Sequence, residues 1–189
     1  MCEIAHDATK ENMSEHANLI LLAQYNTWMN AKLYEAAAAL SPQALNEDRG
    51  AFFGSLMGTL NHIVSADTIW LKRFAALSTS ELLDPIRALP APGALGAIFS
   101  PELAPLATHR KMIDAVIEAW TGQLATPDLD ATLHYRNMAG LAGGKRLGSV
   151  LVHFFNHQTH HRGQASTLLS QAGVDLGVTD LLALIPDRA

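Results

Sequence analysis

Four histidines lie within nine residues of this 189-residue chain, at positions 153, 157, 160 and 161. An even scatter of the chain's nine histidines would place about 0.4 in a window of that length. Residues four apart lie one turn above each other on an α-helix, so His153, His157 and His161 share one helical face. Two imidazoles one turn apart can bind the same transition-metal ion. The spacing therefore predicts a metal site, with His157 and His161 as its adjacent pair.

A third ligand is expected from a second helix, because catalytic zinc sites typically have three protein ligands and one open position. His62 is the strongest choice, since it lies within an apolar segment that is predicted to be helical. Its neighbours one turn away, Gly58, Thr59, Ser65 and Ala66, are all small and would leave room for an ion. A single buried histidine is more often a hydrogen-bonded core residue, so the spaced pair carries more weight than His62 alone.

The other two histidines of the cluster are given different roles. His153 could be a fourth ligand, but it lies one turn further along and is interpreted as a core residue or a neighbour of the ligands. His160 points roughly 100° away from His161 on a helix and is not expected to bind the metal.

The residue types disfavour other known chemistries. A zincin protease has a glutamate directly after the first histidine of the pair as its general base, but here that residue is Gln158, which cannot accept a proton. A di-iron carboxylate bundle needs glutamates from several helices, and the histidine-rich segment contains none. Cys2, the single cysteine, falls in a predicted tail and is a poor choice of nucleophile.

Four long amphipathic segments can supply the helices that position the histidines. Their apolar residues recur every three or four positions, which predicts helices over about 15–40, 52–77, 102–124 and 147–171. Ser14 and Ser100 are expected to cap the first and third helices, and Gly173 to end the fourth. The pattern predicts an all-α four-helix bundle as a single domain over 14–189.

The segments between these helices are also informative. Residues 78–101 contain four prolines and two glycines, and this length predicts a crossover loop between helices that are not hairpin partners. Residues 130–148 alternate in polarity and then carry glycines, so we expect a small β-hairpin or an ordered loop there. A short helical turn is expected over 179–185. The polar residues 1–13 form a predicted loose tail, in which Met13 could be the natural start.

The overall composition limits the partners that we expect. Charged residues make up 16% of the chain, against roughly 25% in a typical soluble domain, so much surface is expected to be buried in the bundle or against a second subunit. A net charge of −5 without a basic stretch disfavours nucleic acid and anionic membranes as partners. The lone cysteine, the polar N-terminus and the short apolar runs predict a cytoplasmic protein that does not span a membrane.

The histidine-rich segment resembles that of the DinB-like (damage-inducible) superfamily, which also includes bacillithiol and mycothiol transferases. The most specific part of the resemblance is the run His-Gln-Thr-His-His-Arg-Gly-Gln over 157–164. Three further segments are similar to the family's: Tyr-Asn-Thr-Trp-Met-Asn over 25–30, the run 53–63 that is followed by Asp67 and Trp70, and Gly-Val-Thr-Asp-Leu-Leu over 177–182. Together they cover most of residues 15–185.

The resemblance implies an up-down-down-up four-helix bundle, often a homodimer, with a zinc or nickel ion held by His62, His157 and His161. It also implies that the metal activates a low-molecular-weight thiol, which is transferred to a small-molecule substrate or helps to isomerise it. The residues that could support the ligands or line the pocket are His153, Asp67, Tyr25, Arg162 and Gln164. We further expect Arg162 to pair with Asp67, and Gly163 to let another helix approach closely.

Three neutral imidazoles leave a bound ion its full +2 charge, so it can lower the pKa of bound water toward about 7 or hold a thiol as thiolate. No dedicated general base is evident near the histidines in the sequence. The leading hypothesis is therefore a metal-dependent enzyme of the thiol S-transferase type. The alternatives are a metal-dependent hydrolase, and a non-catalytic dimeric bundle that binds a metal or another ligand. The substrate is not predicted.

Overall fold

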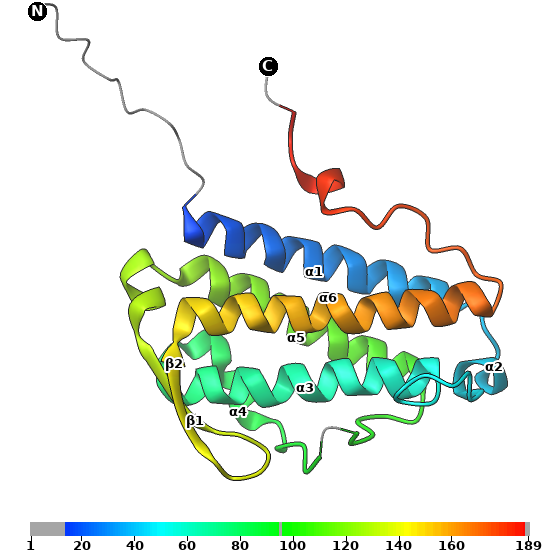
Figure 1. The fold of residues 1–189 in the computed structure, drawn as a ribbon, viewed down its shortest axis with the longest axis horizontal. Coiled ribbons are helices and arrows are strands. Elements are labelled where there is room, and N and C mark those ends of the chain that lie inside the picture. The colour runs from blue at the N-terminus through cyan, green and yellow to red at the C-terminus, as the bar shows by residue number, and fades with distance from the viewer. Residues whose placement is uncertain (1–13, 95, 188–189) are drawn as a thin grey trace, which may run out of the picture.

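Four long helices lie side by side in the computed structural model, which describes residues 14–94 and 96–187. They are α1 (Glu15–Ala37), α3 (Leu56–Leu77), α5 (Leu103–Gln123) and α6 (Leu147–Gln171). Figure 1 shows α1 and α6 running in one direction and α3 and α5 in the other. This order confirms the predicted all-α, up-down-down-up bundle. The predicted tail, Met13 included, lies outside the described residues.

The ends of α1 and α6 follow the signals in the sequence. The Oγ atom of Ser14 accepts a hydrogen bond from the backbone N–H of Ala17 at 3.1 Å, so Ser14 caps α1 as predicted. At the other end of the bundle, Gly173 follows α6 with a φ of 78°. Glycine adopts this left-handed backbone without steric cost, which explains why the helix stops there.

The first helix is shorter than predicted, because a second one begins directly after it. α1 ends at Ala37 rather than near residue 40, and α2 (Pro42–Asn46) follows. The Oγ atom of Ser41 accepts a hydrogen bond from the N–H of Ala44, and Pro42 occupies the first turn of α2. Ser41 and Pro42 are thus a cap and a first-turn proline, the combination that starts a helix.

The second long helix begins at Leu56 rather than near residue 52, because the chain turns sharply before it. Gly54 has a φ of 71°, and Ser55 caps α3 by accepting a hydrogen bond from the N–H of Gly58 at 3.1 Å. The turn brings the carbonyl oxygen of Phe53 so close to α3 that a Cβ atom on Gly58 would lie 2.1 Å from it. Gly58 is therefore required by this close backbone approach.

Two glycine-to-alanine substitutions should change stability in opposite directions. Gly58→Ala should lower the free energy of unfolding by about 1–3 kcal/mol, because the backbone of Phe53 has to move. Gly163→Ala on α6 should raise it by up to about 1 kcal/mol, because alanine favours the helix and its Cβ would meet no atom within 4 Å in the described chain. Urea denaturation of both variants measures the difference. Equal effects of the two substitutions would contradict the different packing of Gly58 and Gly163. The same open space shows that the prediction of another helix close to Gly163 is wrong.

The crossover between α3 and α5 is more ordered than the linker predicted for it. It contains a 3-10 helix over Glu81–Leu83 and the short helix α4 (Asp84–Ala88). Leu83 and Ile86 are both fully buried, so packing against the bundle fixes these turns despite the prolines around them. The predicted cap Ser100 is also wrong: α5 begins at Leu103 with Glu102 as its N-cap. 

The predicted hairpin before the last long helix is confirmed. Strands β1 (Thr132–Arg136) and β2 (Ala142–Arg146) pair in antiparallel fashion, after a 3-10 helix over Thr126–Asp130. The predicted terminal turn is a 3-10 helix over Leu181–Leu184. Among the residues that the structure describes, no helix has a stretch long and apolar enough to cross a bilayer.

A buried charged cluster crosses the otherwise apolar interior of the bundle. The Nη1 atom of Arg110 on α5 lies 2.5 Å from Oδ2 of Asp67 on α3, and its Nη2 atom lies 2.8 Å from Oδ1 of Asp114. The side chains of Asn26 and Asn30 on α1 donate hydrogen bonds to the same carboxylate of Asp114. Burial raises the pKa of Asp114 to about 6, although the nearby Arg110 charge opposes that shift. The cluster links α1, α3 and α5 behind the histidines.

Candidate metal centre

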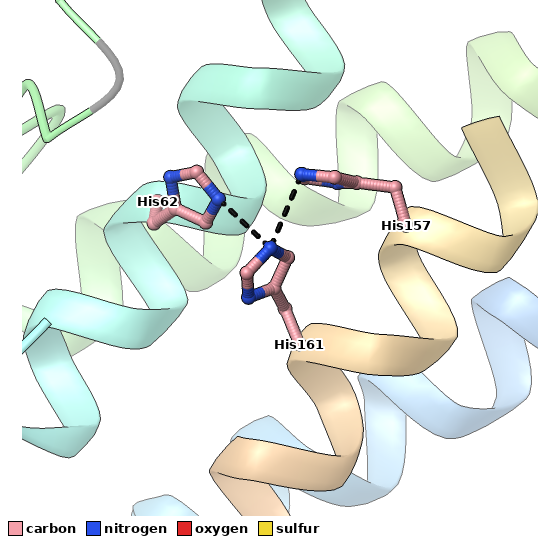
Figure 2. A group of neighbouring side chains, drawn as sticks. All are labelled: His62, His157 and His161. Carbon is pink, nitrogen blue, oxygen red and sulfur yellow. Dashed lines mark hydrogen bonds between the residues drawn. The ribbon is translucent and has the colours of Figure 1, made fainter. Parts of the chain in front are cut away.

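The three histidines predicted as ligands converge from two neighbouring helices. Figure 2 shows the ring of His62 on α3 facing the rings of His157 and His161 on α6. The Nε2 atom of His161 lies 3.1 Å from Nε2 of His62 and 3.1 Å from Nε2 of His157. One ligand nitrogen from each ring falls within a mutual distance of 4.8 Å. Tetrahedral imidazole ligands at about 2.0–2.1 Å from an ion would be about 3.3 Å apart, so the nitrogen set fits a divalent metal.

The environment of His157 and His161 favours their neutral form, which is the form that binds metals. Burial lowers the pKa of His157 to about 3, and the charges that His161 and His62 would carry act in the same direction. Burial also lowers the pKa of His161. An ordinary histidine takes up a proton near pH 6.5, whereas these rings keep their lone pairs at more acidic pH. An arriving ion would therefore not have to displace protons from His157 or His161.

Gln164 orients one of the ligands. The Nδ1 atom of His161 donates a hydrogen bond to Oε1 of Gln164 at 2.8 Å. With its ring proton on Nδ1, His161 turns the lone pair of Nε2 toward His62 and His157. Metal-binding histidines commonly donate their other ring N–H to such an acceptor, which fixes the tautomer and the ring orientation. The structure thus places Gln164 directly beside the centre.

Phe53 forms a wall of the centre, a role that the sequence interpretation did not give it. Its ring stacks on that of His62, with centroids 3.9 Å apart and an interplanar angle of 18°. It also meets the ring of His161 at a centroid distance of 5.6 Å. The free space expected around His62 is filled on this side. In the sequence, Gly58 could have indicated this contact, because only a glycine there lets the backbone of Phe53 come close to α3.

His153 does not join the three ligands. Its ring centroid lies 6.1 Å from that of His157 and 5.3 Å from that of Trp70. The side chain is exposed, so the interpretation of His153 as a core residue is wrong, although it does neighbour a ligand. His160 is exposed as well, and its Nε2 atom lies 3.4 Å from the amide nitrogen of Gln164.

Asp67 lies behind the centre but pairs with a different arginine from the one predicted. Its Oδ2 atom contacts Arg110 and also accepts a hydrogen bond from Nε2 of Gln158 at 2.8 Å. The expected pair of Asp67 with Arg162 is wrong, because Arg110 reaches across from the facing helix and occupies that position. Gln158, next to the ligand His157, is thereby turned into the core and away from the metal ligands.

Arg162 and Tyr25 lie together on the side of α6 that packs against α1. The guanidinium of Arg162 donates hydrogen bonds to the side chains of Asn26 and Thr159, and it lies 5.2 Å from the centroid of the Tyr25 ring. The hydroxyl of Tyr25 donates a hydrogen bond to the carbonyl oxygen of Thr179 at 2.7 Å. These predicted pocket residues therefore hold α1, α6 and the C-terminal segment together and do not face the three histidines.

The centre combines a buried ligand with two that are partly accessible. His62 is 3% exposed, whereas His157 and His161 are half-buried. Among the described residues, the metal-ligating group consists of histidines alone and includes no carboxylate. Three neutral ligands would leave a divalent ion its full charge and one open coordination position. Such an ion would supply Lewis-acid chemistry to a small molecule bound there.

Comparisons with known proteins agree with this geometry. The DinB family profile matches residues 13–186 and so includes all three histidines. A similar protein, Protein DinB of Bacillus subtilis (strain 168), is 23% identical over 159 residues, which cover 84% of this chain and 88% of the relative. No solved structure matches the chain significantly. The match over nearly the whole bundle shows that the chain belongs to the DinB family.

Proposed function

We propose that this protein is a metal-dependent enzyme that joins a low-molecular-weight thiol to a small electrophilic substrate. His62, His157 and His161 would hold the divalent ion, and zinc or nickel suits such imidazole ligands. The observation that carries the proposal is the convergence of three Nε2 atoms, with two of the pairs 3.1 Å apart, together with the burial that favours the neutral form of His157 and His161.

The bound ion would supply positive charge that stabilises a thiol as its thiolate at neutral pH. The sulfur then forms a bond to the electrophilic carbon, the leaving group departs with the bonding electrons, and the thiol proton passes to solvent. The chain's own part is to fix the ligand rings. Gln164 holds the tautomer of His161, and Phe53 stacks on His62.

The surroundings of the centre favour a thiol over a hydrolytic reaction. A metal-dependent hydrolase commonly uses a general base to guide the attacking water. Gln158 is turned into the core, and Asp67, at 1% exposed, is already bonded to Gln158 and Arg110. Neither can receive a proton at the centre, whereas a thiolate needs no further deprotonation. We retain the hydrolase and the non-catalytic binding bundle as alternatives.

The proposal extends to the protein's surroundings. We expect it to act as a homodimer in the cytoplasm, without a nucleic-acid or membrane partner. The net charge of −5 and the low charged fraction of 16% support these expectations. Exposed apolar side chains, such as Phe52 at 86% and Leu182 at 76%, give a second copy apolar surface to cover.

A conjugation assay tests the proposal. The zinc- or nickel-loaded protein is incubated with bacillithiol, mycothiol, glutathione or cysteine and with monochlorobimane, and thioether formation is followed by fluorescence. At least one thiol should react about tenfold or more above the uncatalysed background. His157→Ala should lose this rate, and His160→Ala should keep it. A protein that binds metal stoichiometrically but accelerates no thiol would instead support the binding bundle, and acceleration of ester hydrolysis alone would support the hydrolase.

A further inference from the structure

A row of aromatic and basic side chains leads away from the metal centre between α3 and α6. The ring of His153 lies one turn before the ligand His157 on α6, with the two ring centroids 6.1 Å apart. The ring of Trp70 on α3 lies 5.3 Å from that of His153. The guanidinium carbon of Arg73 lies 4.4 Å from the centroid of the Trp70 ring. We name His153, Trp70 and Arg73 the α3–α6 strip.

The β-hairpin holds the far end of the α3–α6 strip in place. Figure 1 shows the hairpin beside the C-terminal end of α3 and the N-terminal end of α6. The ring of Tyr135 on β1 lies 5.4 Å from that of Trp70 and 4.9 Å from the guanidinium carbon of Arg73. The Nη2 atom of Arg73 donates a hydrogen bond to the carbonyl oxygen of Arg136 at 2.9 Å. These contacts fix the guanidinium, which lowers the entropy cost of binding a ligand to it.

The remaining donors of the α3–α6 strip are open to solvent. Within the described part of the chain, the Nη1 and Nε atoms of Arg73 and the Nε1 atom of Trp70 make no hydrogen bond, and none of the three is fully buried. The side chain of His153 is exposed, and those of Trp70 and Arg73 are partly exposed. A molecule that arrives from solvent can therefore reach every member of the strip.

The charge of the α3–α6 strip indicates a ligand with an acidic group. Among the residues that the structure describes, no carboxylate forms an ion pair with Arg73. Partial burial lowers the pKa of Arg73, but the ordinary value of an arginine is so high that the side chain stays cationic at neutral pH. A fixed guanidinium with free N–H donors and an unbalanced charge suits a carboxylate.

The position of Arg73 sets the length of such a ligand. Arg73 follows His62 by eleven residues on α3, which corresponds to about 16 Å along the helix axis. Its side chain returns over Trp70 toward the start of the helix, so the guanidinium lies nearer to the metal centre than its backbone does. A carboxylate close to a metal-bound sulfur, as in cysteine, would not reach it. The distance therefore favours a thiol whose acidic group is separated from the sulfur by a long spacer.

We propose that the α3–α6 strip binds an elongated thiol substrate, with the sulfur at the metal and a carboxylate of its far end at Arg73. The middle of the molecule lies over the rings of His153 and Trp70. The acid is assigned to the thiol because the strip begins beside the ligand His157, where the sulfur would bind. This inference rests on the proposed function, and it makes Arg73 the residue that selects the thiol.

Mercapto acids and their matching mercapto alcohols test the strip on the cobalt-substituted full chain. Cobalt(II) replaces zinc in tetrahedral sites, and a bound thiolate gives it a charge-transfer absorption band whose titration yields the Kd. Mercaptooctanoic acid is long enough to span the strip and should bind about tenfold more tightly than mercaptooctanol. Arg73→Met should abolish this preference and leave the Kd of the alcohol unchanged. Arg73→Lys, which retains the charge, should keep most of the preference.

Two controls separate Arg73 from a general effect of charge. Mercaptopropionic acid is too short to reach Arg73, so Arg73→Met should leave its Kd unchanged. Arg136 follows Tyr135 on β1 and projects from the opposite face of the strand, so Arg136→Met removes a neighbouring charge and should leave every Kd unchanged.

The outcomes distinguish this inference from the proposed function. If thiols give the cobalt band but mercaptooctanoic acid and mercaptooctanol bind equally, or if Arg73→Met preserves the preference, the inference alone is overturned and Arg73 only holds the hairpin. If the cobalt-loaded protein gives no band with any thiol, the proposed function is overturned together with the inference.

Discussion

Replacement of His157 by alanine is expected to reduce bound zinc or nickel from about one ion per chain to less than about 0.1. His157 supplies one of three nitrogens around a common point, and its Nε2 atom lies 3.1 Å from that of His161. The two nitrogens that remain cannot provide the three protein ligands that such centres use. Mass spectrometric metal analysis after dialysis against a weak chelator measures the loss.

The neighbouring histidine on the same helix provides the control for this experiment. His160 is exposed, and it lies outside the group of three, so His160→Ala should retain the metal content of the parent protein. Gln164→Leu should keep the three ligands but release the tautomer of His161, and should weaken metal binding by about 10–100-fold. Equal metal contents in the parent protein and in His157→Ala would contradict the site.

Arg110→Met is expected to lower the free energy of unfolding by about 3–5 kcal/mol, which makes it the most destabilising single change that we expect. Methionine fills a similar volume, so the loss comes mainly from charge. Asp67 and Asp114 are 1% and 3% exposed, and both would lose their cationic partner inside the bundle. Urea denaturation at pH 7.5 measures the change, with Lys111→Met, an exposed neighbour on α5, as a control expected to stay within about 0.5 kcal/mol of the parent protein.

The pH dependence separates this electrostatic cause from a packing defect. Burial already raises the pKa of Asp114 to about 6 in the folded protein, and loss of the Arg110 charge should raise it further. An acid whose folded pKa lies above its unfolded value binds more protons when folded, so folding becomes more favourable as the pH falls toward the unfolded pKa near 4. The penalty of Arg110→Met should therefore be smaller at pH 5 than at pH 7.5. A penalty that is equal at both pH values would indicate lost packing instead.

The elements that the sequence predicts well are those specified by local patterns. Apolar periodicity located all four long helices, and the cap Ser14 and the terminator Gly173 act through backbone contacts within a few residues. The four-residue spacing of His157 and His161 likewise determines their shared face. For these features, local geometry is enough.

The features that the sequence left open depend on which surfaces meet in three dimensions. Arg110 and Arg162 are both cations that could pair with Asp67. Arg110 forms the pair because α5 packs beside α3. The stacking of Phe53 on His62 depends on the turn before α3. The apolar periodicity continues through this turn, so it predicted a helix that begins too early. Burial of Ile86 against the bundle turned part of the proline-rich crossover into a helix.

X-ray absorption at the zinc edge of the zinc-loaded protein decides whether the three histidines bind the metal, because it reports the atoms around the ion itself. We expect three imidazole nitrogens at about 2.0–2.1 Å with the multiple scattering typical of histidine rings, and one additional light atom or thiol sulfur. His62→Ala should remove one imidazole contribution or the ion altogether. A spectrum without imidazole scattering, or one that His62→Ala leaves unchanged, would contradict a centre built from these two helices.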